Sequence, residues 1–169
     1  MSKQELIRHY YAYNAWANNR LLDIAGELDD PELRGSQGAS FESILGNMAH
    51  IAAAQVNWLE RWQGGVNRVS TVELAEGMSS LADLREVFDR SHKELGDFIP
   101  GLTDERLDEP IVYKDSRGQQ NRLPFWQLLL HVANHGTYHR GEVAMALSAL
   151  GRSPGDLDFQ GWELAGGPG

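Results

Sequence analysis

The strongest fold signal in the chain is residues 124–150, which read PFWQLLLHVANHGTYHRGEVAMALSAL. Pro124 suits the first turn of a helix, where its missing N–H costs nothing. Apolar residues fill most of the stretch, and Gly151 follows as a helix terminator. The pattern predicts one helix from Pro124 to Leu150 that must pack against other apolar surfaces.

Three more stretches place apolar residues at three- and four-residue spacing, which predicts amphipathic helices. They are Lys3–Leu28, Phe41–Trp62 and Leu81–Phe98. Serines precede them as expected N-caps, at positions 2, 40 and 80. Four helices of this length and pattern are typical of a helical bundle.

The segments that connect the predicted helices are expected to differ in structure. We expect Val66–Ser79 to be irregular, and Leu102–Leu123 to be an insert before the last helix. In that insert Ile111-Val112-Tyr113 favours extended structure and Asp115-Ser116-Arg117-Gly118 a turn, which together predict a short hairpin. The tail, Arg152–Gly169, has an apolar middle that could dock on the bundle. The predicted fold is all-α with this hairpin, in a single domain of residues 1–169.

The amino-acid composition narrows the range of possible functions. The chain has 169 residues, with 41% hydrophobic and 23% charged, an ordinary globular balance. There are no cysteines, so any metal must be bound by His, Asp or Glu. The net charge of −9 argues against binding to nucleic acid. Neither a signal peptide nor a membrane span is recognisable, so we expect a cytoplasmic protein that makes no membrane contact.

Histidines are the most informative side chains. Three of the six, His131, His135 and His139, lie four residues apart in the last predicted helix. Neighbours in this run are about 6 Å apart along the axis and can share an ion, whereas the outer two are about 12 Å apart and cannot. The ligand pair is therefore His131 with His135, or His135 with His139. His50, in an apolar helix, is the best third ligand.

Other readings compete with a metal site. A mid-helix histidine is commonly a hydrogen-bonded structural residue, and a binding module without metal would bury its histidines that way. His9 and His92 lie among charged residues, so we expect them to be solvated. For Arg140 and Glu142 we favour ion pairs over capture of a substrate carboxylate or proton transfer. Asn134 is a candidate for orienting a histidine ligand.

Three motifs together resemble the DinB/YfiT-like superfamily. They are Leu130–Val143 (LHVANHGTYHRGEV), Tyr13–Leu22 (YNAWANNRLL) and Ile44–Ile51 (ILGNMAHI). The resemblance implies an up-down-down-up four-helix bundle and one divalent ion, zinc or nickel, bound by His50, His135 and His139. His131 then becomes a packing residue or a neighbour of the ligands. Many members of this superfamily are homodimers, and the resemblance implies the same here.

Characterised branches of the superfamily that the chain resembles transfer low-molecular-weight thiols or isomerise maleylpyruvate with a thiol cofactor. The resemblance thus implies a metal-dependent enzyme, a thiol S-transferase or a hydrolase, that acts on a small molecule with a thiol as cosubstrate. The alternative is a non-enzymatic stress-response protein whose metal only stabilises the bundle. No catalytic residue beyond the metal ligands is predicted.

Overall fold

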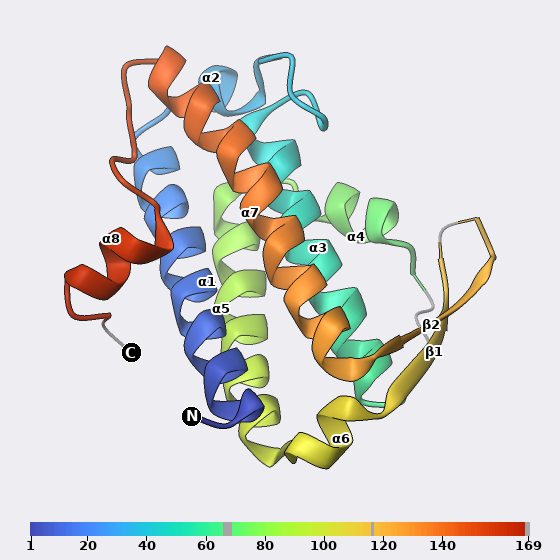
Figure 1. Cartoon of the computed structure of the whole chain (residues 1–169). Coiled ribbons are helices and arrows are strands. Elements are labelled where there is room, and N and C mark those ends of the chain that lie inside the picture. Colours follow the sequence, from blue (N-terminus) through green and yellow to red (C-terminus); the bar gives the residue numbers. More distant parts are fainter. Residues whose placement is uncertain (66–68, 116, 168–169) are drawn as a thin grey trace.

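Four long helices dominate the computed structural model, which describes residues 1–65, 69–115 and 117–167. They are α1 (Lys3–Ala25), α3 (Ile44–Trp62), α5 (Leu81–Phe98) and α7 (Phe125–Ala149). Each of α1 and α3 packs against both α5 and α7. In Figure 1, α1 and α7 run towards one end of the molecule and α3 and α5 towards the other. Within the described residues, no helix has the length and apolarity needed to cross a bilayer.

The first helix begins where the sequence predicts. Ser2 and Glu5 form the expected capping box. The helix ends at Ala25, three residues before the predicted Leu28. A short helix that the sequence analysis missed, α2 (Asp30–Arg34), follows at once, because the Asp29 side chain caps it and Pro31 lies in its first turn.

The second predicted helix starts later than expected. The prediction of a start at Phe41 with Ser40 as cap is wrong: α3 begins at Ile44, and the Ser43 hydroxyl accepts a hydrogen bond from the Gly46 N–H at 3.0 Å. Glu42 has a φ of 62°, in the left-handed region, so the chain cannot be helical through this residue. Ser40 and Phe41 therefore belong to the loop between α2 and α3.

The connection after α3 is more regular than predicted. It contains α4 (Thr71–Gly77), which begins with a capping box formed by Ser70 and Glu73. The prediction of an irregular segment over Val66–Ser79 is therefore wrong for these residues, and residues 66–68 lie outside the described part of the chain.

The insert before the last long helix contains the predicted hairpin. Strands β1 (Pro110–Lys114) and β2 (Gln120–Pro124) pair antiparallel. The expected turn at Asp115–Gly118 is described except for Ser116, and the Gly118 N–H donates to the Asp115 carbonyl at 3.0 Å. Two further short helices, η1 (Ile99–Gly101) and α6 (Asp104–Asp108), precede the hairpin. After α7, Gly151 takes a φ of 74° and reverses the chain.

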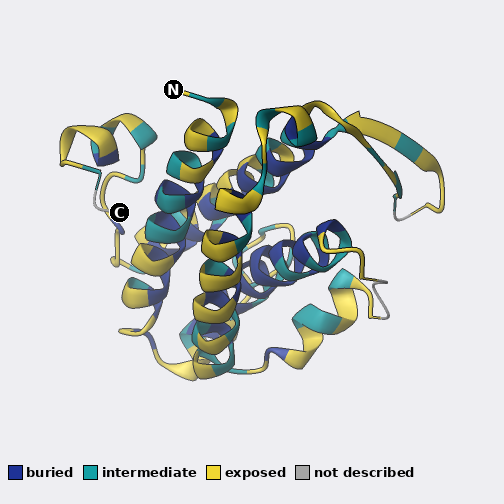
Figure 2. Cartoon of the chain, turned by 90° about the horizontal axis from the view of Figure 1, so that it is seen from below, coloured by how far each residue is buried: buried dark blue, intermediate teal, exposed yellow. Residues whose placement is uncertain are grey.

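The apolar core lies between the long helices, on the inward faces coloured as buried in Figure 2. One cluster includes Leu21, Met48, Phe88 and Leu147, and a second includes Ile7, Leu59, Leu95 and Phe125. The tail docks as the sequence suggests: α8 (Phe159–Leu164) packs Trp162, only 2% exposed, against Tyr13 and Ala17 of α1.

Candidate metal centre

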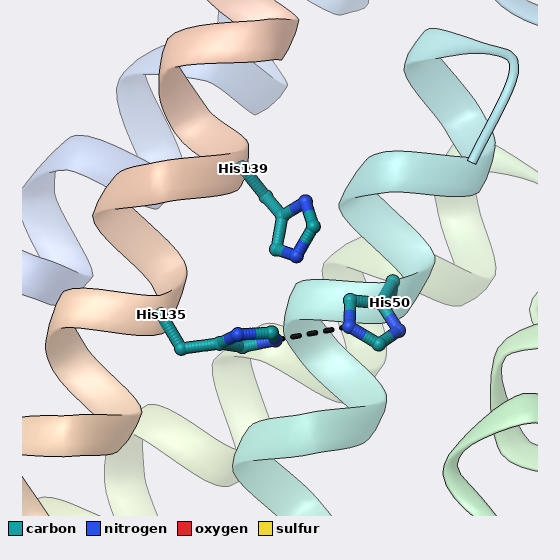
Figure 3. A group of neighbouring side chains, drawn as sticks. All are labelled: His50, His135 and His139. Atoms are coloured by element: carbon teal, nitrogen blue, oxygen red, sulfur yellow. Dashed lines mark hydrogen bonds between the residues drawn. The ribbon is translucent and has the colours of Figure 1, made fainter. Parts of the chain in front are cut away.

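Three histidines converge between α3 and α7 (Figure 3). His50 comes from α3, and His135 and His139 from successive turns of α7. Each offers one ring nitrogen, and these three atoms lie within 4.8 Å of one another. The Nε2 atoms of His50 and His135 are 2.9 Å apart. The three residues are those that the family resemblance implied, and His50 and His135 come together although 85 positions separate them in the sequence.

The electrostatic environment keeps two of these rings neutral. Burial, together with the neighbouring His135 and His139 rings, lowers the pKa of His50 to about 4. Burial, with His139 and His131 nearby, also lowers the pKa of His135 to about 4. Near neutral pH both imidazoles thus present a free lone pair, the form that a metal ion requires.

The residues fit a metal ion by the chemistry of their donor atoms. Three imidazole nitrogens suit zinc, nickel or another first-row transition ion better than magnesium or calcium, which prefer oxygen ligands. The Nε2 atom of His50 faces His135, whereas its buried Nδ1 lies on the far side of the ring without a hydrogen-bond partner among the described residues. Nε2 is therefore the His50 nitrogen that an ion in this group would use.

Glu142 determines which nitrogen of His139 is free. Its carboxylate accepts a hydrogen bond from His139 Nδ1 at 2.8 Å and from the Ser40 hydroxyl at 2.6 Å. Burial alone raises the pKa of Glu142, but the hydrogen bonds from Ser40 and His139 outweigh it and lower the pKa below its ordinary value. The proton on Nδ1 leaves Nε2 of His139 free to bind an ion. Metal-binding histidines commonly have such a carboxylate partner.

The loop between α2 and α3 covers the group. The Phe41 ring stacks on His50, with ring centroids 3.8 Å apart and planes at 19°, and meets His139 edge-on at 5.4 Å. A Cβ at Gly46 would collide with the Phe41 carbonyl oxygen, so the absence of a side chain there lets the loop approach α3. Ser40 and Phe41 thus contact the site from a loop that the sequence analysis had assigned to a helix.

Beside His50 the surface opens into a hollow of about 460 Å³. The loop residues Ser40, Phe41 and Glu42 form one wall, and Val72 of α4 lies on another. His50 lines this hollow and His135 and His139 do not, so a small molecule held there would approach the group from the His50 side.

Arg140 lies next to the site, and its contacts differ from the ion pair that was predicted for it. It is only 2% exposed, and its guanidinium donates to Asn14 Oδ1 at 2.6 Å, Asn18 Oδ1 at 3.0 Å and Thr137 Oγ1 at 2.7 Å. The prediction of an ion pair is wrong, since these partners are neutral and no carboxylate pairs with Arg140 among the described residues. At 2% exposure, with its N–H groups donating to these three side chains, the guanidinium has little surface available to a substrate carboxylate.

The amides that accept from Arg140 continue into a polar network through the core. The Asn14 side chain donates to Gln55 of α3 at 3.1 Å, and Gln55 donates to the Ser91 hydroxyl of α5 at 2.8 Å. With Arg140 on α7 and Asn14 on α1, each of the four long helices contributes at least one member. The network satisfies polar groups that would be costly to bury alone.

The remaining candidates lie outside the three-histidine group. His131 is exposed, with its ring 5.8 Å from the Trp58 ring and 6.1 Å from the His135 ring. The prediction of solvated rings is wrong for His92, which is partly buried, bonds to Asn18 at 3.2 Å and has its pKa lowered by burial to about 4.

His9 is likewise only partly exposed, because it contacts the Glu163 carboxylate and the Trp162 ring of α8. Asn134 is exposed on α7. The sequence analysis missed Glu142 as a partner of a ligand, although its spacing of three residues from His139 places both side chains on one helix face.

Comparison with known proteins shows which family this chain belongs to. The model of the DinB family matches residues 1–165. The chain is also 26% identical over 162 residues to the Protein DinB of Bacillus subtilis (strain 168), an alignment that covers 88% of each chain. The family match spans all four long helices and all three clustered histidines. The chain belongs to the DinB family.

Proposed function

We propose that this protein is a metal-dependent enzyme that binds one divalent ion, zinc or nickel, through His50, His135 and His139. The observation that carries the proposal is the convergence of three ring nitrogens from two helices within 4.8 Å. Three protein ligands are the usual set of a catalytic zinc site, in which a further coordination position stays open.

The ion would supply Lewis-acid chemistry, which polarises a carbonyl or lowers the pKa of a thiol or water. The protein's own residues have distinct tasks. Glu142 holds the proton on His139 Nδ1, and the Phe41 ring excludes water from one face of His50. The hollow beside His50 gives a small molecule access. This access favours an enzyme over a non-enzymatic protein with a purely structural metal, which needs no such opening.

For the reaction we propose a thiol S-transferase or hydrolase acting on a small molecule, with a low-molecular-weight thiol as cosubstrate. The thiol chemistry of the superfamily branches that the chain resembles supports this class of reaction. We further propose that the protein is a cytoplasmic homodimer that does not bind nucleic acid, and the net charge of −9 supports the last point. We class the fold as an up-down-down-up four-helix bundle, supported by the contacts and directions of the long helices.

Metal analysis of untagged protein tests the ligand assignment. We expect about one zinc or nickel ion per chain in the wild-type protein and less than about a tenth of that in His135→Ala, because two ligands rarely suffice. The matched control is His131→Ala, one helical turn away, which should retain the metal. Full metal content in His135→Ala would contradict the proposal. Assays with glutathione, mycothiol and bacillithiol plus electrophiles then test the reaction class.

A further inference from the structure

A second, larger hollow of about 750 Å³ lies one helical turn from the three-histidine group. It is a groove bordered by the last turns of α3, by α4 and by β1, and we call it the α3–β1 groove. Its lining includes Trp58, Arg61, Tyr113 and His131. None of these residues belongs to the proposed metal site, so the groove has no role yet in the proposed function.

One wall of the groove is aromatic. The Trp58 ring meets the Tyr113 ring at 5.2 Å and the His131 ring at 5.8 Å, both edge-on. Trp58 and Tyr113 are each partly exposed, so their surfaces are open to a ligand. Aromatic surfaces with a few polar groups are typical of small-molecule sites, because they bind flat or apolar parts of a ligand with little loss of side-chain entropy.

The groove also contains an arginine without an ionic partner. The Arg61 guanidinium lies over the Trp58 ring, 4.5 Å from its centroid. No carboxylate pairs with Arg61 among the residues that the structure describes. Partial burial lowers its pKa, a sign that the charge has lost part of its hydration. A guanidinium fork in this state is suited to binding a carboxylate with two hydrogen bonds.

Two carboxylates, Glu73 and Asp115, also line the groove, and neither forms an ion pair with Arg61. Glu73 accepts hydrogen bonds from the Ser70 N–H in the α4 capping box, at 2.9 Å. Asp115 accepts from the N–H groups of Arg117 and Gln119 in the hairpin turn, at 3.0 and 2.9 Å. Both carboxylates stay ionised near neutral pH, because these hydrogen bonds lower their pKa, and Lys114 adds a second positive charge to the lining. An anion bound against the aromatic wall would meet the Arg61 guanidinium, which lies over the Trp58 ring.

The groove and the metal site are connected in two ways. The His131 ring, on the groove wall, is 6.1 Å from the ring of the ligand residue His135. Val72 lines both the groove and the hollow beside His50. Along α3, Arg61 is eleven residues from His50, which corresponds to about 16 Å of helix. A molecule that reaches from one to the other must be elongated.

We propose that the α3–β1 groove binds an elongated organic anion, with a terminal carboxylate on Arg61, its middle against Trp58 and His131, and its reacting end at the three histidines. This inference rests on the proposed function, since it assigns the substrate class of the same metal site. It makes Arg61 a specificity-determining residue that contacts the substrate far from the reacting atoms.

Matched probes test the charge requirement. Binding of 4-phenylbutanoate and of its neutral analogue 4-phenylbutanamide to the full chain is measured by calorimetry, in metal-free and zinc-loaded protein. We expect the carboxylate to bind about tenfold more tightly than the amide in both forms, the value of one charge-assisted contact. Binding of the carboxylate should also shift the NMR signal of the Trp58 indole N–H, identified by its absence in Trp58→Phe.

Variants then locate the contact. Arg61→Gln should abolish the tenfold preference, and Arg61→Lys should retain part of it because it keeps the charge. Arg122→Gln is the matched control, since it removes a positive charge from an exposed position of the same hairpin, outside the groove. All three should keep the wild-type zinc content.

Three results would overturn the inference: no binding of either probe, equal affinities for both, or a preference that survives in Arg61→Gln. A preference seen only in zinc-loaded protein would also overturn it, because the carboxylate would then be binding the ion. Each of these results leaves the metal analysis unaffected. Loss of metal from the wild-type protein would instead contradict the proposed function itself.

Discussion

Replacement of Glu142 tests how the ligands are held in position. The Glu142 carboxylate accepts the Nδ1 hydrogen of His139 at 2.8 Å, and both side chains are largely shielded from water, at 19% and 5% exposure. Glu142→Gln keeps an acceptor oxygen but removes the charge, and Glu142→Ala removes both. We expect the affinity for zinc to fall in that order, because the carboxylate holds Nε2 of His139 towards the other two histidines and makes it a better donor.

The expected loss of zinc affinity can be calculated from the strength of the hydrogen bond between His139 and Glu142. A bond to a charged group contributes about 1.5–3 kcal/mol and a neutral one about 1 kcal/mol. The glutamine variant should therefore lose about 1.4 kcal/mol, or tenfold in the dissociation constant for zinc. The alanine variant should lose closer to a hundredfold, the upper end for partners of metal-binding histidines.

Competition with a zinc-binding indicator dye at pH 7.5 measures these constants on untagged protein. Glu76→Gln is the control, because Glu76 is an exposed carboxylate that lines the hollow beside His50, and its loss changes the net charge equally. Nitrogen-15 spectra of the metal-free protein should show the Nδ1–H tautomer of His139 in the wild type and a mixture in Glu142→Ala. Identical zinc affinities in the wild type and both Glu142 variants would refute this account.

Three further changes test the structure around the site. Because burial lowers the pKa of His92 from 6.5 to about 4, the unfolded chain binds more protons than the folded one between these values. The free energy of unfolding of metal-free protein should thus fall as the pH drops from about 6.5 to 4, and less so in His92→Gln, as measured by urea denaturation. Gly46→Ala should cost about 1–3 kcal/mol in the same assay, since its Cβ would meet the Phe41 carbonyl, whereas Gly96→Ala, with open space around it, should be neutral or stabilising. Glu42→Gly should stabilise the protein by about 1 kcal/mol by relieving the left-handed φ of 62°, visible as a higher Tm.

The long helices could be predicted because their signals are local. Apolar spacing, serine caps and terminating glycines lie within the segments themselves. The start of α3 could not be predicted in this way, since Ser40 and Ser43 are both competent caps and only the backbone of Glu42 separates them. The short helix α4 was not predicted, because a seven-residue helix without a buried residue shows no regular spacing of apolar residues.

For the metal site, the rise per residue of a helix left two histidine pairs as possible ligands. The family resemblance, rather than the spacing, selected His135 and His139. The structure brings these two together with His50. The contact of Glu142 with Ser40 could not be predicted, because it joins residues 102 positions apart through a loop that the sequence analysis had assigned to a helix. The neutral partners of Arg140 are equally distant, and a charge pattern on one helix gives no indication of them.

The network around Arg140 also has a consequence for the order of folding. Arg140 is separated from Asn14 by 126 residues and from Asn18 by 122. Contacts at such separation form late, because the chain must first lose the entropy of closing a long loop. The hydrogen bonds from Asn14 to Gln55 and from Gln55 to Ser91 need only the first three long helices. Because α7 provides Arg140 as well as His135 and His139, the Arg140 bonds and the three-histidine group form only when this helix docks. Until α7 docks, Asn14 and Asn18 lack the Arg140 guanidinium as a hydrogen-bond donor, so this part of the network and the three-histidine group are completed in the same step.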